Sequence, residues 1–244
     1  MINILSSDAI DPSRLFKEAK RKADEDNLQW LSRNLPDGTG NATFVLVGGK
    51  TQTSLRLRIG QAHVRHDLMP SYWSHVMLLG KPSKNSALTP VYEISLEPLN
   101  GFGFPPPTNG MQKGRLSQYR EAAAYPNIAV IVAPVPLTEV VAALDRFQKQ
   151  RSVLDTVDLI IRWLSYVWGV SNSPNPLLSG LGIPSAAMLE VAIGAAGFDV
   201  TPGLESRSSC PEAIWQAAKW WHEYYEDQHK QGLIGAYNVE HRLE

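Results

Sequence analysis

Two polar residues interrupt neighbouring apolar segments of this 244-residue sequence, and both have side chains that can carry out acid–base chemistry. His75 lies within the apolar segment 73–79, and Glu93 lies within the apolar segment 90–96. A buried imidazole needs hydrogen-bond partners, because an unpaired buried donor or acceptor costs about 1–3 kcal/mol. If the two segments are paired antiparallel strands, the glutamate can orient the histidine as the third group of a catalytic triad. The alternatives are a hydrogen-bonded core histidine and a partly exposed glutamate on an edge strand.

Such a pair needs a nucleophile, and the N-terminus of a helix stabilises developing negative charge and lowers a thiol pKa. Two predicted helices begin beside suitable side chains: Ser185 follows Pro184, and Cys210 precedes Pro211. Cys210 is the single cysteine, so intramolecular disulfides and cysteine-rich zinc sites are excluded. As the only thiol it is the simplest candidate for the nucleophile. Both Ser185 and Cys210 can equally be ordinary helix-capping residues.

The other histidines give weaker signals. His63 and His66, together with Asp67, could suggest a metal site, but no fourth ligand lies at a diagnostic spacing. His222 and His229 fall on the polar face of the last predicted helix, where we expect them to be solvated. The sequence therefore predicts neither a bound metal nor a cofactor.

The elements that must position these residues change from strands to helices along the chain. Alternating or continuous apolar runs predict strands, and apolar residues spaced by three or four predict helices. The order of one helix, about five strands and then several helices predicts an α+β fold with an antiparallel sheet. Strands are expected at residues 43–47, 54–59, 74–79, 91–96 and 128–132. Helices are expected from residue 11 toward 31, at 137–147, 153–164 and 188–197, and from 211 onward, with a long irregular loop at 98–126.

Composition excludes several classes of protein. Hydrophobic residues make up 43% and charged residues 19% of the chain, and the net charge of -1 argues against nonspecific nucleic-acid binding. No stretch reaches the roughly 20 apolar residues that cross a bilayer, and the N-terminus lacks the pattern of a secretory signal, so cytoplasmic synthesis is expected. We expect a single domain over 1–244, with a helical extension at 1–40, a strand-rich half at 41–135 and a helical half at 136–244.

The order of these motifs resembles that of the circularly permuted NlpC/P60 papain-like hydrolases. The motifs are Trp-Ser-His-Val at 73–76, Val-Tyr-Glu at 91–93 and a helix that opens after Ile-Pro at 183–184. In that family the first strand supplies the general base, the second supplies the acid that orients it, and a helix-opening cysteine comes last in the sequence. The resemblance covers roughly residues 55–215. It implies a permuted papain-like fold with a small antiparallel sheet packed against helices, with His75 as the general base and Glu93 as the group that orients it.

Position 185 departs from the family pattern, because Ser185 stands where the nucleophilic cysteine is expected. Cys210 then falls at a later helix start, so the resemblance argues against it as the nucleophile. Three explanations of the serine are open: an engineered Cys→Ser replacement, a natural pseudoenzyme and a working serine nucleophile. We favour the first, since the rest of the motif is intact and a hydroxyl is a far weaker nucleophile than a thiolate. A cysteine restored at position 185 is expected to be more reactive than Cys210.

The resemblance implies a thiol-type amide hydrolase, of the cysteine peptidase kind, that cleaves the peptide of bacterial peptidoglycan. Combined with cytoplasmic synthesis, such an activity is typical of an antibacterial effector toxin that a type VI secretion system delivers to the periplasm of a target cell. An immunity protein and a component of the secretion system would then be its partners. The alternatives are a lipid-directed acyltransferase or thioesterase of permuted papain fold, and a binding protein in which His75 and Glu93 are core residues.

Overall fold

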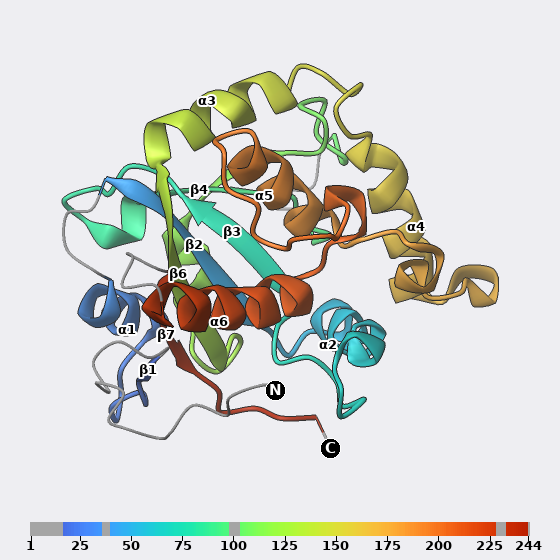
Figure 1. Ribbon diagram of the computed structural model, residues 1–244. Coiled ribbons are helices and arrows are strands. Elements are labelled where there is room, and N and C mark those ends of the chain that lie inside the picture. Colours follow the sequence, from blue (N-terminus) through green and yellow to red (C-terminus); the bar gives the residue numbers. More distant parts are fainter. Residues whose placement is uncertain (1–16, 36–39, 98–102, 228–232, 244) are drawn as a thin grey trace, which may run out of the picture.

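A seven-stranded sheet forms the centre of the computed structural model, which describes residues 17–35, 40–97, 103–227 and 233–243 (Figure 1). Its strands are β1 (Lys17–Glu18), β2 (Asn41–Gly48), β3 (His75–Leu79), β4 (Pro90–Glu93), β5 (Gln112–Arg115), β6 (Asn127–Pro136) and β7 (Ile234–Asn238). The order across the sheet is β1-β7-β6-β2-β3-β4-β5. All neighbouring strands run antiparallel except β1 and β7, which are parallel. The protein is therefore a mixed α+β structure with a mostly antiparallel sheet.

Helices cover both faces of this sheet (Figure 1). The α-helices are α1 (Asn27–Asn34), α2 (Gln52–Gly60), α3 (Leu137–Phe147), α4 (Thr156–Trp168), α5 (Pro184–Gly194) and α6 (Pro211–Asp227). Short 3-10 helices are η1 (Ala62–Val64), η2 (Ser86–Leu88), η3 (Leu116–Tyr119), η4 (Val170–Asn172), η5 (Pro176–Ser179) and η6 (Ser206–Ser208). One face packs against α3, α4, α5 and α6, and the other packs against α1 and η3.

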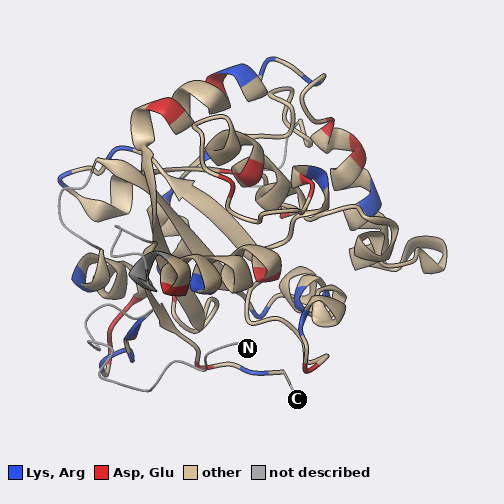
Figure 2. Cartoon of the chain, in the orientation of Figure 1, with Lys and Arg blue, Asp and Glu red and all other residues tan. Residues whose placement is uncertain are grey.

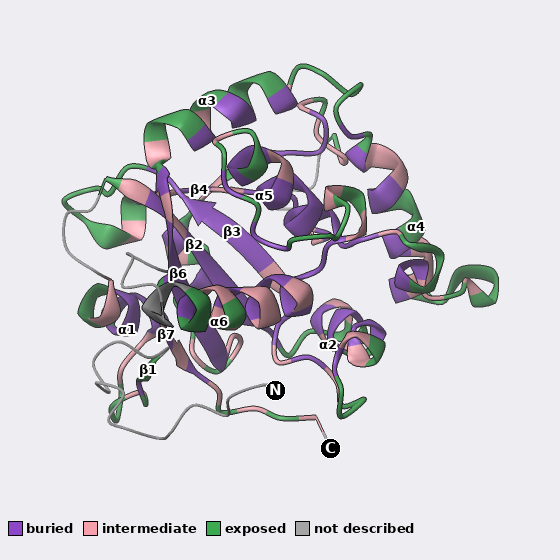
Figure 3. Cartoon of the chain, in the orientation of Figure 1, coloured by how far each residue is buried: buried purple, intermediate pink, exposed green. Residues whose placement is uncertain are grey.

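Strand β3 shows how the two faces are divided. Val76 and Leu78 belong to the larger core beneath α3 to α6, whereas Met77 and Leu79 belong to the smaller core beneath α1 and η3. This division follows from the pleat of a strand, in which successive side chains point to opposite faces. Both cores are closed to solvent, so the sheet is buried on both sides (Figure 3). Helix α5 lies deepest of the helices, and nine of its residues are buried.

The segment expected to be a strand at 54–59 is instead helix α2, and that prediction was wrong. Its alternation of leucine and arginine fits a strand, but the local cap favours a helix. Thr51 is the N-cap, and its side chain accepts a hydrogen bond from the amide of Ser54. The helix also buries Arg58 completely, which the sequence pattern assigned to the polar face of a strand.

The prediction of an N-terminal helix from residue 11 toward 31 is also wrong from residue 17 onward. Residues 11–16 lie outside the described residues. Lys17–Glu18 forms β1, and the helix begins only at Asn27. Asp26 and Gln29 form a capping box that fixes this start. The expected helical extension therefore contributes a strand, β1, to the sheet. Its partner β7 comes from the half of the chain that we expected to be helical, and β7 also pairs with β6.

The remaining sequence predictions agree with the structure to within a few residues at most ends. Strands β2, β3, β4 and β6 and helices α3, α4 and α6 occupy the expected segments, while α5 starts earlier than expected and ends at Gly194. Contrary to the expectation that no stretch is long and apolar enough to cross a bilayer, one segment among the described residues, Val170–Gly194, meets that requirement by length and composition. Its most apolar window is 67% buried inside the protein, as is usual for a core helix, so this finding is weak support for a membrane span.

Candidate functional site

His75 and Glu93 meet on the face of the sheet covered by α1 and η3. His75 opens β3 and shares its face with Met77 and Leu79, and Glu93 closes the neighbouring strand β4. The imidazole Nε2 lies 2.7 Å from Oε2 of Glu93, within hydrogen-bond distance. Glu93 is fully buried, and the His75 side chain is 13% exposed. The antiparallel pairing of β3 and β4 therefore brings together the two residues that the sequence singled out.

A third side chain, Tyr119, completes this cluster from η3. Its hydroxyl donates a hydrogen bond to the same carboxylate oxygen of Glu93, and its ring stacks on the imidazole with centroids 6.0 Å apart. Burial, together with the charge of Glu93, raises the pKa of Tyr119 well above its usual value of 10. The phenol therefore stays protonated and acts as a hydrogen-bond donor that holds the carboxylate in place.

The histidine lines a small polar pocket at the start of β3. Because Nε2 is bonded to Glu93, and no described residue forms a hydrogen bond with Nδ1, Nδ1 is the nitrogen available to a molecule in the pocket. The lining is mostly polar and aromatic, with two leucines, and contains no lysine or arginine. It consists of Thr53, Ser54, Leu57, Ser74, His75, Ser95, Leu96, Glu97, Tyr119 and Tyr125.

The first turn of α2 forms one wall of this pocket. Thr51 caps the helix and donates a hydrogen bond to Glu97, with 2.5 Å between the two oxygens. Thr53 and Ser54 follow on the pocket wall, and their hydroxyls form no hydrogen bond with the described residues. The amides of the first turn of a helix lack intrahelical partners and carry partial positive charge. The pocket thus contains an oriented imidazole, free hydroxyls and a helix N-terminus.

The structure does not bring Ser185 to this cluster, which corrects the geometry expected from the order of the motifs. Ser185 lies in the first turn of α5, and the residues that follow it pack in the core on the opposite face of the sheet. It is fully buried, it does not line the pocket, and its hydroxyl has no hydrogen-bond partner among the described residues. The separation follows from strand parity, because His75 points away from the helices that pack beside Val76.

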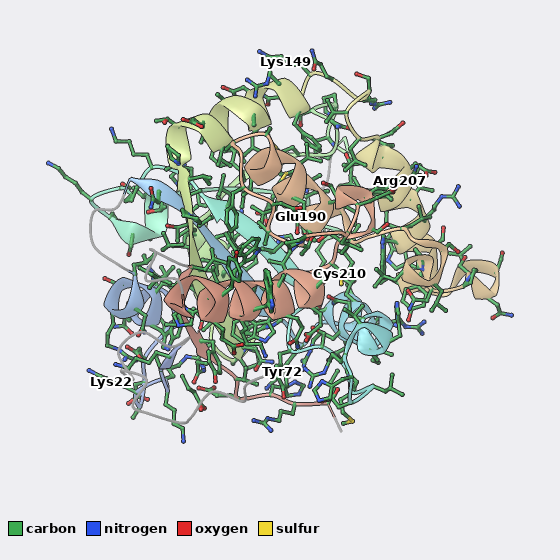
Figure 4. The ribbon with its side chains drawn as sticks, in the orientation of Figure 1. Lys22, Tyr72, Lys149, Glu190, Arg207 and Cys210 are labelled. Carbon is green, nitrogen blue, oxygen red and sulfur yellow. The ribbon has the colours of Figure 1, made fainter. Side chains whose placement is uncertain are left out.

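Cys210, labelled in Figure 4, is buried directly before α6. It belongs to the larger core, across the sheet from the face that His75 shares with Met77 and Leu79. Burial raises the pKa of its thiol to about 12, so it is a thiol and not a thiolate at neutral pH. Its neighbour Ser209 donates a hydrogen bond to Glu190 of α5, which Thr201 also contacts. Desolvation raises the pKa of Glu190 to about 7.

The residues that the sequence suggested for a metal site, and the histidines of the last helix, lie outside this cluster. Asp67 is bound by the guanidinium of Arg65 at 2.8 and 2.5 Å, which lowers the pKa of the carboxyl far below its usual value. Within the ranges that the structure describes, no group of three His, Cys, Asp or Glu side chains is placed to hold a metal ion. His222 is not solvated as expected, since it is buried and its Nδ1 lies 2.7 Å from the carbonyl oxygen of Leu233. His229 lies outside the described residues.

Sequence reasoning missed Tyr119 and the hydroxyls of α2. Tyr119 lies in the segment 98–126, which we expected to be irregular, and no local pattern shows that η3 packs on β4. Thr53 and Ser54 were missed because their segment resembles a strand. The combination of a Thr cap at position 51 with two preceding glycines was the signal for a helix start.

Comparisons of the chain with protein-family models, with curated proteins and with solved structures give no match. Any statement about function therefore depends on the geometry of the site and on the residues themselves.

Proposed function

We propose that the protein is a hydrolase of acyl compounds, with His75 as the general base and Glu93 as the residue that orients it. One observation carries this proposal: Nε2 of His75 is bonded to buried Glu93 at 2.7 Å, which leaves Nδ1 for the pocket. A histidine held in this way can take a proton from a nucleophile and return it to the leaving group. Tyr119 acts through Glu93 as a positioning residue, because its hydroxyl contacts only the carboxylate.

The nucleophile in this proposal comes from the pocket and not from position 185. Nδ1 would accept the proton of a hydroxyl of Thr53 or Ser54, or of a water molecule, while the oxygen adds to the acyl carbon. The carbonyl oxygen would become negatively charged in that step. The amides of Gln52 and Thr53 in the first turn of α2 are suited to stabilise it, because the Ser54 amide already donates to the side chain of Thr51.

Proton return from the imidazole to the leaving nitrogen or oxygen then expels the leaving group. If water is the nucleophile, the acid is released in this step. If Thr53 or Ser54 is the nucleophile, the acyl group stays on its oxygen as an ester, and His75 then activates a water molecule that hydrolyses the ester and restores the hydroxyl.

The resemblance to the permuted NlpC/P60 hydrolases supports an amide of cell-wall peptide as the first substrate class to examine. It also supports the permuted papain-like arrangement and the role of a secreted antibacterial effector with an immunity partner. These remain parts of the proposal. The absence of a cysteine from the pocket lining distinguishes this site from the thiol hydrolases of that family.

The test is an assay of the purified chain on isolated peptidoglycan, with mass analysis of products, and on an activated ester as a general acyl substrate. His75→Gln keeps a hydrogen-bond donor toward Glu93 but removes the base, so turnover should fall by about 10²–10⁴-fold. Ser185→Ala is the matched control, and we expect it to retain turnover because Ser185 does not line the pocket. Thr53→Val and Ser54→Ala separate the nucleophiles: loss in one of them identifies the hydroxyl, and retention in both identifies water.

Equal turnover by the wild-type protein and His75→Gln would contradict the proposal. Loss of turnover in Ser185→Ala but not in His75→Gln would also contradict it, and would restore position 185 as the reactive group. If neither substrate is cleaved, the binding-protein alternative stands, with His75 and Glu93 as a buried structural pair.

A further inference from the structure

A projecting segment with exposed apolar side chains lies outside the polar pocket and shares no residue with its lining. It consists of the end of α4, the turn η4 and the turn η5, and it extends from the side of the molecule in Figure 1. Trp168 is 65% exposed, Val170 is 48% exposed and Leu178 is 69% exposed. We call these three residues the apolar tip. Single exposed apolar residues are ordinary, but a large aromatic and two aliphatic side chains on one projection call for a partner.

The tip belongs to a stretch without charge. None of residues 163–189 is Asp, Glu, Lys, Arg or His, and the projecting segment carries neither blue nor red in Figure 2. Upstream on α4, Ile161 is 56% exposed and lies seven residues before Trp168, so both side chains lie on one face of the helix. Removing this surface from water therefore requires no charged group of the segment to lose its hydration.

The backbone fixes the tip as a tight turn. Gly169 ends α4 in the left-handed conformation, with φ of 67°, and a side chain there would be strained. Ser171 and Asn172 also have positive φ, at 49° and 54°. These conformations reverse the chain directly after Trp168 and leave Val170, the first residue of η4, exposed.

Basic side chains lie at the base of the tip. Nη1 of Arg56 is 3.8 Å from the position that a β-carbon would take at Gly169, and within the described ranges no acidic side chain forms an ion pair with Arg56. Further along, Arg162 and Arg207 share one carboxylate, that of Asp158, at 3.1 and 3.5 Å. An uncharged apolar tip above basic side chains is complementary to a surface that is apolar inside and anionic outside.

We propose that the apolar tip inserts into the interfacial region of a lipid bilayer that contains anionic headgroups. Trp168 would lie at headgroup level, where tryptophan is favoured, and Val170 and Leu178 would enter the acyl boundary. Arg56 would contact lipid phosphate. The membrane is not spanned, because most of α5 is buried in the core of the protein.

The size and shape of the tip favour a bilayer over a second copy of the chain. Three partly exposed side chains offer an apolar area on the order of 300 Å², whereas a stable protein interface buries about 800 Å² on each partner. A projecting tip also presents a convex surface, which suits a deformable bilayer better than another folded protein. This inference is independent of the proposed hydrolase activity, since the tip and the polar pocket share no residue.

The test is co-flotation of the full-length chain with vesicles of phosphatidylcholine alone and of phosphatidylcholine mixed with phosphatidylglycerol. We expect binding to the mixed vesicles, and a loss of more than about tenfold in partition for the variant Trp168→Ser/Val170→Ser/Leu178→Ser. Trp220→Ser is the matched control, because Trp220 is 49% exposed on α6, away from the tip, and its replacement should leave partition unchanged. Arg56→Gln should weaken binding to the mixed vesicles by about fivefold.

Two further measurements keep the test decisive. Circular dichroism melting curves verify that each variant folds. Tryptophan fluorescence should shift to the blue on addition of mixed vesicles, and Trp168→Phe should remove that shift. Failure of the wild-type chain to float, or equal flotation of the triple variant, would overturn the proposal. A dimer in light scattering that the triple variant abolishes, without vesicle binding, would overturn it in favour of a second copy.

Discussion

Two buried glutamates lie on opposite faces of the central sheet, and their partners differ in kind. Glu93 lies 2.7 Å from the imidazole of His75, a group that can carry a positive charge. Glu190, on α5, accepts hydrogen bonds from Thr201 at 2.9 Å and from Ser209 at 3.2 Å, and no described cation pairs with it (Figure 4). The first site opens to a pocket, whereas the second is enclosed by helices.

The difference shows how the surroundings of a buried carboxylate decide what it can do. An imidazolium beside Glu93 can neutralise a negative charge inside the protein. Glu190 has the hydroxyls of Thr201 and Ser209 and the backbone of Thr201 as donors but no cation among the described residues, so burial dominates and raises its pKa to about 7. The first arrangement is suited to proton transfer with a bound molecule, and the second makes the stability of the fold depend on pH.

The largest expected effect on stability comes from breaking the pair of His75 and Glu93. Replacement of His75 by Ala should lower the free energy of unfolding by about 3–5 kcal/mol, because it leaves the buried Glu93 carboxylate without the imidazole and with only the hydrogen bond from Tyr119. His75→Gln should lose less, since its amide can donate to Glu93. Denaturant unfolding at neutral pH measures both. The double variant His75→Ala/Glu93→Gln should recover part of the loss, and a loss below about 1 kcal/mol in His75→Ala would show that the pair contributes little.

On the other face, Glu190 should make stability fall as the pH rises. Its pKa is about 7 in the folded protein and 4.5 without burial, so between these values the folded state holds a proton that the unfolded state has released. The free energy of unfolding should therefore decrease by about 3 kcal/mol over this window and level off above it.

Glu190→Gln supplies the comparison for that prediction, because the amide cannot titrate. The difference in unfolding free energy between wild type and variant, measured from pH 4 to 8, cancels the contributions of other titrating groups. Relative to wild type, the variant should gain stability as the pH rises through the window. A constant difference across this range would show that Glu190 is not titrating within it.

A smaller effect is expected at Tyr119, whose hydroxyl donates a hydrogen bond to Glu93. Tyr119→Phe keeps the ring stacked on the imidazole but removes the hydrogen bond to the carboxylate, and should destabilise the protein by about 2 kcal/mol. Tyr125→Phe is the control, because its hydroxyl forms no hydrogen bond with a described residue, and it should change stability by less. Equal losses of stability in the two variants would show that the hydrogen bond from Tyr119 to Glu93 does not stabilise the fold.

The smallest effect is expected at position 185. In Ser185→Cys the new thiol would be buried away from His75, so iodoacetamide should label it no faster than Cys210, whose pKa burial raises to about 12. Peptide mass spectrometry distinguishes the two sites. Fast labelling at position 185 that disappears with His75→Gln would contradict the placement of these residues on opposite faces.

Local patterns of apolar residues were sufficient to predict an element that has one buried face or that is buried on all sides. The apolar run 128–132 predicted the central strand β6, and the stripe in 137–147 predicted α3. They failed where a short pattern fits two structures, as in α2, or where polar residues pair at the edge of the sheet, as in β5. Partners far away in the chain stabilise such elements, so their signal is not local.

The sequence by itself determined that His75 and Glu93 interrupt neighbouring apolar strands, and the pairing of adjacent strands then placed them together. It did not determine which face of the sheet each helix covers. Neighbouring residues of a strand point to opposite faces of the sheet, so a shift of one residue moves a side chain to the other face. The order of strands and helices along the chain is the same in both cases and does not reveal which face a helix covers. Only the tertiary structure could therefore decide that Ser185 lies across the sheet from His75 and that Tyr119 and the first turn of α2 surround the imidazole.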